Sequence, residues 1–179
     1  MLALSMGALL TAPCLMPEGY TWLTHTTSES AAQGLAGAWL ARLGFLLFGL
    51  GVLWLAVILI NNWSRAATWM HVVFGVLMIG TAVFSHRPFI SGVPFDPVED
   101  WLHSLTATLM GFAFALGVFF RLLQRGKRTM QWLDLAALVS AIGIPLLMMN
   151  FPGIGGLMQR VMFLVAYLWY GTEAWRLGT

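Results

Sequence analysis

The chain has 179 residues, of which 59% are hydrophobic and only 9% are charged, with a formal net charge of +2. Soluble domains carry about 25% charged residues, and a chain of this size cannot hide so many apolar side chains in its interior. The composition therefore excludes a water-soluble globular domain and a disordered chain, and it predicts a membrane protein. A single cysteine excludes a disulfide framework and a cysteine-based zinc site.

Six apolar stretches follow one another along the chain. A helix needs about 20 apolar residues to cross a bilayer, and lipid leaves a continuous helix as the only way to satisfy the backbone of such a stretch. Five stretches meet that length: residues 36–60, 66–84, 101–123, 132–149 and 157–175. The first, residues 1–16, is shorter, and Pro13 ends it. We expect a shortened first membrane helix there, because a secretory signal needs basic residues before its apolar core.

The chain is therefore expected to form one all-α domain over residues 1–179, a polytopic transmembrane bundle of six helices. Basic residues in short loops mark the cytoplasmic side of a membrane protein. They follow helices two, four and six here, at Arg65, Arg125, Lys127, Arg128 and Arg176. Five of the seven acidic residues fall in segments on the opposite side. We expect both termini in the cytoplasm and the protein in the inner (cytoplasmic) membrane of the cell.

Histidines and carboxylates gather in the segments expected on the outer side. His25 and Glu29 stand four residues apart, and Asp100 and His103 three apart, so each pair would share one face of a helix. Together with His86, they are ligand types for a divalent metal such as zinc, or a general base held by an acid. The predicted metal ligands are His25, His86, Asp100 and His103. The predicted catalytic residues are His25, Ser28 and Glu29, and the identity of any cofactor is left open.

Each pair also has a purely structural interpretation. Ser28 or Ser30 would cap a helix that has Glu29 in its first turn. Asp100 and His103 would be a cap and a polar neighbour at the start of a helix. Two ionisable groups elsewhere are expected to be structural. Glu173 and Arg176, three apart, predict a surface pair. His71 predicts a helix-packing residue, and it has no histidine at matching depth with which to hold a haem.

Arg42 lies about two turns inside the second predicted helix, on the outer side. A charge within a membrane normally faces the bundle interior or a wet cavity and has a partner. Glu29 or the acidic segment 96–100 would supply that partner, while snorkelling to the outer headgroups is the alternative. If it points inward, Arg42 would bind an anionic group of a substrate, such as a lipid phosphate or carboxylate.

The order of these features resembles a six-helix membrane family of bacteria and archaea, the domain of unknown function 998. A short first helix is followed by Tyr20 and then by the polar segment 25–29, and His103 stands near the start of the fourth predicted helix. The resemblance implies that Tyr20, Ser28, Glu29 and His103 match the family's pattern. It also implies six helices and no settled activity. Tyr20 joins Arg42 as a candidate substrate-binding residue.

Two classes of function remain open. The first is an intramembrane enzyme, a metal-assisted hydrolase or transferase that acts on a lipid-like substrate at the outer face. The second is a non-catalytic accessory subunit whose aromatic and methionine-rich helices pack against other membrane proteins. A transporter is less favoured because no helix centre carries an ionisable residue, which usually marks a conduction path. The lipid bilayer is the expected partner, and no nucleic acid is expected.

Overall fold

The computed structural model describes residues 1–125 and 132–176. Every regular element in those residues is helical, which confirms the all-α prediction. The α-helices are α1 (Leu2–Thr11), α2 (Thr27–Ser30), α3 (Ala38–Ile58), α4 (Arg65–Val83), α5 (Pro97–Arg125), α6 (Trp132–Asn150) and α7 (Gly155–Trp175). Short 3-10 helices at Ala12–Leu15 and Pro152–Ile154 follow α1 and precede α7.

Four of the described helices, α3 to α6, are long and apolar enough to cross a membrane. α7 has the same length as α3, but Gln159, Arg160 and Glu173 interrupt its apolar sequence. α1 has ten residues, which at a rise of about 1.5 Å per residue span only half of a bilayer core about 30 Å thick. The structure thus supports a multi-pass membrane protein with four apolar spans, and the number of six stays a prediction.

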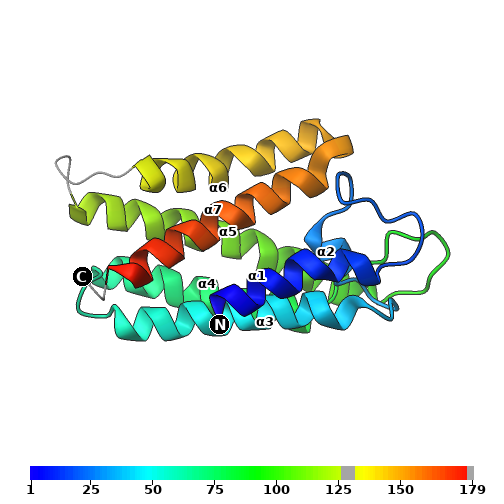
Figure 1. The fold of residues 1–179 in the computed structure, drawn as a ribbon, viewed down its shortest axis with the longest axis horizontal. Helices are drawn as coiled ribbons and strands as arrows, with labels where there is room; N and C mark the ends of the chain where they lie inside the picture. Colours follow the sequence, from blue (N-terminus) through cyan, green and yellow to red (C-terminus); the bar gives the residue numbers. More distant parts are fainter. Residues whose placement is uncertain (126–131, 177–179) are drawn as a thin grey trace.

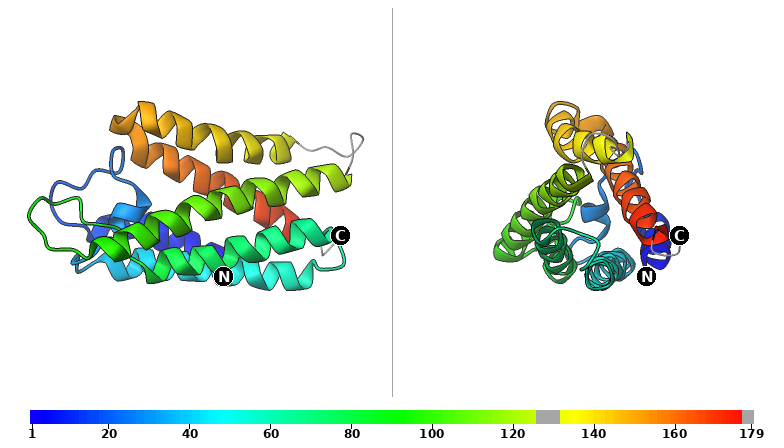
Figure 2. Two further views of the ribbon diagram at one scale, coloured as in Figure 1. Left: turned by 180° about the vertical axis from the view of Figure 1, so that it is seen from behind. Right: turned by 90° about the vertical axis from the view of Figure 1, so that its left-hand side faces the viewer.

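The long helices run side by side along one axis, as Figure 1 shows. α1 lies along α3, α4 packs between α3 and α5, and α6 lies at the margin of the bundle beside α7 (Figures 1 and 2). Glycines set the closest approach: a Cβ on Gly49 would lie 2.7 Å from the carbonyl oxygen of Gly75, so the backbones of α3 and α4 touch. Aromatic rings, among them Phe45, Phe48 and Phe74, fill the core.

The two ends of the bundle differ in composition. One end, called here the loop end, carries residues 17–37, 84–96 and 151–154 and lies on the right in Figure 1. The other, called here the basic end, carries residues 59–65 together with Arg121, Arg125 and Arg176. Lys127 and Arg128, which support the expected orientation, lie outside the described residues.

Candidate functional site

Two loops that are far apart in the sequence meet at the loop end. Gln33, which is buried, joins them: its amide nitrogen donates to the carbonyl oxygens of Ser85 and Asp96, and its amide oxygen accepts from the backbone of Asp96. The backbone N–H of Gln33 also donates to the carbonyl oxygen of His86 at 2.9 Å. The two polar segments of the sequence analysis, residues 20–30 and 86–100, are thus brought together on one side of the bundle.

The segment between α1 and α2 takes its shape from the start of α7. Arg160 donates from Nη1 to the carbonyl oxygens of Trp22 and His25, at 2.9 and 2.8 Å, and from Nη2 to the Tyr20 hydroxyl at 2.6 Å. A Cβ on Gly156 would lie 2.3 Å from the carbonyl oxygen of His25, so only glycine allows this approach. Tyr20 in turn donates to the Thr26 carbonyl oxygen. Burial raises the pKa of the Tyr20 phenol, which Arg160 partly opposes, so the hydroxyl stays protonated and able to donate.

Thr26 begins α2 with a capping box, in which it exchanges hydrogen bonds with Glu29. The Glu29 Oε2 accepts from the backbone N–H and the hydroxyl of Thr26, at 2.6 and 2.9 Å, and the backbone of Glu29 donates to the Thr26 hydroxyl. The expected cap at Ser28 or Ser30 is therefore wrong, because both lie inside the helix. Glu29 is held in one orientation by this box.

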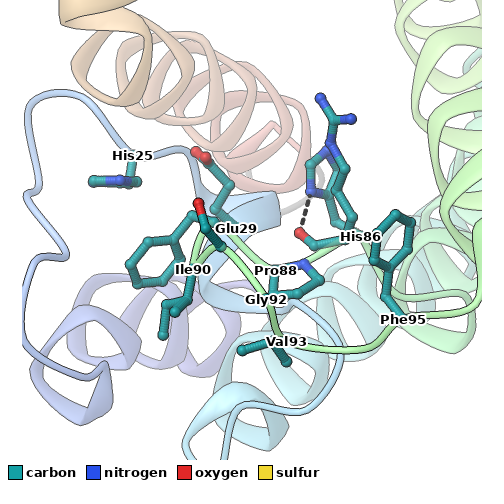
Figure 3. Close-up of a pocket in the computed structure, with 11 residues that line it drawn as sticks. His25, Glu29, His86, Pro88, Ile90, Gly92, Val93 and Phe95 are labelled. Atoms are coloured by element: carbon teal, nitrogen blue, oxygen red, sulfur yellow. Dashed lines mark hydrogen bonds between the residues drawn. The ribbon is translucent and has the colours of Figure 1, made fainter.

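A pocket of about 470 Å³ opens between the two loops. His25, Glu29, His86 and Arg87 supply its charged and titratable groups, and the loop 88–95 supplies the rest of the lining. In the view of Figure 3, Glu29 lies between His25 and His86, with Ile90 and Val93 beneath it. The volume of the pocket falls within the range of about 300–1,000 Å³ that is usual for ligand sites.

The two imidazoles of this pocket have opposite hydrogen-bonding patterns. The Nδ1 of His25 accepts from the backbone N–H of Thr21 at 3.0 Å, so in the neutral ring the proton is on Nε2. The Nδ1 of His86 lies 2.8 Å from the carbonyl oxygen of Arg87, which can only accept, so the neutral ring keeps its lone pair on Nε2. One ring therefore offers a donor at Nε2, and the other an acceptor.

His103 and Asp100 lie beside this pocket without lining it. The His103 side chain is buried, its Nδ1 donates to the carbonyl oxygen of Phe84 at 2.9 Å, and its Nε2 has no partner among the described residues. Its ring lies edge-to-face with His86, with 5.4 Å between centroids. Asp100 accepts from the backbone N–H of Arg87 and lies 3.9 Å from the Nε2 of His86. The cap of α5 is Asp96, not Asp100, because Asp96 accepts from the backbone of Val98.

The structure does not bring the predicted metal ligands together as one set. Within residues 1–125 and 132–176, no group of three or more His, Cys, Asp or Glu side chains is placed to hold a metal ion. His86, Asp100 and His103 are neighbours, as described above. His25 packs instead against Tyr20 and Phe89, with ring centroids 5.1 and 4.6 Å away.

The remaining predicted residues lie outside the pocket lining. Ser28 is buried in α2, and Tyr20 is engaged with Arg160 and Thr26. Arg42 donates from Nε to the carbonyl oxygen of Ala31 at 3.1 Å. It forms no ion pair with a carboxylate in the described part of the chain, so the expected partner, Glu29 or segment 96–100, is not the one observed. Arg42 instead ties α3 to the end of α2.

Two basic residues of the loop end were not predicted from the sequence. Arg87 lines the pocket, and Arg160 shapes the segment that carries His25. Both stand on the acid-rich side of the chain, against the general charge asymmetry. Their position could have identified them, because a basic residue on the side that is poor in basic residues is expected to have a specific local partner.

A second group of polar side chains is buried at the basic end. Glu173 is 2% exposed and pairs with Arg121, Arg125 and Arg176, and it also accepts from the indole N–H of Trp63. Asp134 pairs with Arg125 and accepts from Trp169. The predicted pair of Glu173 and Arg176 is present, with 2.8 Å between its charged atoms. Its predicted place at the surface is wrong, because α5 and Trp63 cover the carboxylate.

His71 lies near this group and packs as expected. It is fully buried between the rings of Trp63 and Trp169, and its Nδ1 shares a hydrogen bond of 2.8 Å with the Tyr170 hydroxyl. A Cβ on Gly117 would lie 2.6 Å from the imidazole, so glycine makes room for the ring.

The four long apolar helices of the described residues indicate a multi-pass membrane protein embedded in a lipid bilayer. The model of the family described as "Protein of unknown function (DUF998)" matches residues 3–176, nearly the whole chain. The protein belongs to this family, which confirms the resemblance drawn from the sequence. No curated protein and no solved structure matches the chain.

Proposed function

We propose that the protein is a membrane-embedded hydrolase or transferase that acts on the polar part of a lipid-like substrate in the pocket of the loop end. The observation that carries this proposal is the pairing of His25 and His86 in one pocket with opposite hydrogen-bonding patterns. A donor and an acceptor imidazole at one site are what general acid–base catalysis needs. Arg87, which lines the same pocket, would bind an anionic group of the substrate.

The roles follow from the ring nitrogens. The Nε2 of His86 takes a proton from water or from an acceptor hydroxyl, which then attacks the carbonyl or phosphoryl centre of the substrate. The Nε2–H of His25 gives a proton to the departing oxygen. Glu29 is fixed by its capping box at the pocket wall and sets the shape and charge of the site. This form of the hypothesis uses the imidazole pair and does not need the predicted metal.

The orientation belongs to the same proposal. The loop end would face away from the cytoplasm of the inner membrane, and the basic end would face the cytoplasm, because Arg65, Arg121, Arg125 and Arg176 lie there. The chain offers a clean test, since Cys14 is its single cysteine. In a Cys14→Ser background, Ser91→Cys should react with an impermeant maleimide added to intact cells, and Asn61→Cys should react only after lysis. The reverse pattern would contradict this orientation.

The reaction is tested with the purified full chain in vesicles of phosphatidylglycerol or of phosphatidylcholine, with lipid products followed by mass spectrometry. We expect turnover of the anionic lipid and about a 100-fold loss in His86→Asn, because removal of a general base typically costs 10²–10⁴-fold. Asparagine keeps a donor for the Arg87 carbonyl oxygen and removes only the Nε2 acceptor. Turnover that is unchanged in both His86→Asn and His25→Asn would refute the proposal.

Two controls make the result specific. Glu29→Gln keeps the capping box, since glutamine also serves at that position, and removes only the charge at the pocket wall. Its counterpart Glu18→Gln removes an exposed loop carboxylate that does not line the pocket. Activity lost on chelation and restored by zinc would favour the metal-assisted form instead.

A further inference from the structure

A second cavity lies on the side of the bundle, between α1 and α7. It has a volume of about 340 Å³ and is lined almost entirely by apolar side chains. α1 contributes Met6, Leu9 and Leu10, and α7 contributes residues from Leu157 to Tyr167. Leu10 and Leu164 are 49% exposed, so the cavity is open to the surface that the bilayer covers. It is called the α1–α7 groove below.

The groove has one charged residue in its wall, Arg160, whose side chain is 7% exposed. Arg160 donates to three carbonyl oxygens and to Tyr20, and its guanidinium lies 4.6 Å over the ring of Trp22. It forms no ion pair in the described residues, and its buried Nε has no hydrogen-bond acceptor there. A buried cation without a counter-charge and with a spare donor favours an anionic ligand.

We propose that the α1–α7 groove binds one acyl chain of a single-chain amphiphile that ends in a carboxylate, with the carboxylate beside Arg160. The apolar lining fits the chain, and the charge of Arg160 complements the head. Trp22 and Thr27 line the groove together with Arg160. A diacyl lipid is not the occupant, because the volume of the groove is near the lower limit of the volumes of ligand pockets and leaves no space for a second acyl chain.

The groove and the polar pocket are separate sites on one segment. Trp22 and Thr27 face the groove, whereas His25 and Glu29 face the pocket. Binding in the groove uses no group of the proposed acid–base pair, so this inference does not rest on the proposed function. A fatty acid held there would instead lie against the segment that positions His25.

The probe is dodecanoate with a diazirine at the end of its chain, added to the full-length protein in phosphatidylcholine nanodiscs. After irradiation, mass spectrometry should place the label in α1 and in the first half of α7. Unlabelled dodecanoate should displace the probe at a concentration about tenfold lower than dodecanol does, which corresponds to about 1.4 kcal/mol for the charged head. Equal competition by dodecanol, displacement by a diacyl phospholipid alone, or label spread over α3 to α6 would overturn the proposal.

Matched variants separate groove binding from general lipid contact. Leu164→Trp fills the groove and should lower labelling about tenfold, which is about 1.4 kcal/mol. Leu168→Trp, one turn further along α7, is 53% exposed and does not line the groove, so labelling should be unchanged. Both positions are exposed, so neither substitution disturbs the core. His86→Asn should label like the wild type, and labelling of Leu164→Trp at the wild-type level would refute the inference.

Discussion

The loop end and the basic end both concentrate polar side chains, but they use them differently. At the basic end, Glu173 and Asp134 are buried and surrounded by arginine and tryptophan donors. At the loop end, Gln33, Glu29 and Arg160 bond mostly to backbone groups, and a pocket stays open between the loops. Charges paired with charges leave little capacity for a ligand. At the loop end the polar side chains mostly hold backbone groups, and His25 and His86 line an open pocket, which is why the proposed function lies there.

The largest effect that would test this contrast is expected from Glu173→Gln. It leaves three arginines around an uncharged amide, and removal of one partner of a buried ion pair costs about 3–5 kcal/mol. The measurement is thermal unfolding of the purified protein in detergent. The same substitution at Glu29 is the control at the loop end, where the capping box survives and the loss should be under about 0.5 kcal/mol. Equal losses at the two ends would remove the contrast.

A smaller loss is expected from Gly156→Ala at the loop end. The new Cβ would meet the carbonyl oxygen of His25, and such overpacking costs about 1–3 kcal/mol. Because the displaced backbone carries His25, reactivity at the pocket should fall with stability. Gly153→Ala is the matched control, since a Cβ there has nothing within 4 Å. A fully stable Gly156→Ala protein would show that α7 does not shape this segment.

The smallest effect is expected from Thr26→Ala, which removes the side-chain half of the capping box. Loss of such a cap costs about 1 kcal/mol, within a range of 0.5–2. Circular dichroism melts compare it with Thr172→Ala, whose hydroxyl donates to the carbonyl oxygen of Leu168 in its own helix, so that stability should change little. If both variants melt alike, Glu29 does not depend on Thr26 for its position.

Composition and hydropathy predicted the helical class and the apolar stretches. A helix that crosses a bilayer needs a long run of apolar residues, and such a run is visible in the sequence whatever the side-chain contacts are. The same reasoning anticipated that residues 20–30 and 86–100 meet at one end, since helices of alternating direction return their loops to the same side. The family followed from residues 20–29 and 100–103. These inferences depend on features that repeat over many residues.

Side-chain partners could not be predicted, because they depend on contacts between distant segments. Glu173 and Arg176 are neighbours on one helix, but Arg121 and Arg125 reach Glu173 from α5, about 50 residues away. Arg42 donates a hydrogen bond to the carbonyl oxygen of Ala31 and does not pair with an acid among the described residues, because the turn after α2 brings that oxygen next to α3. Spacing within one helix indicates a shared face and does not show what covers that face.

The dependence of the Tyr20–Thr27 segment on α7 has a consequence for biosynthesis. Arg160 and the His25 backbone that it holds are 135 positions apart. The segment therefore leaves the ribosome long before α7 is synthesised. It lacks its contacts with Arg160 while four apolar helices insert into the membrane. A transcript cut short before α7 would yield a protein able to enter the membrane, yet with this segment open to proteolysis.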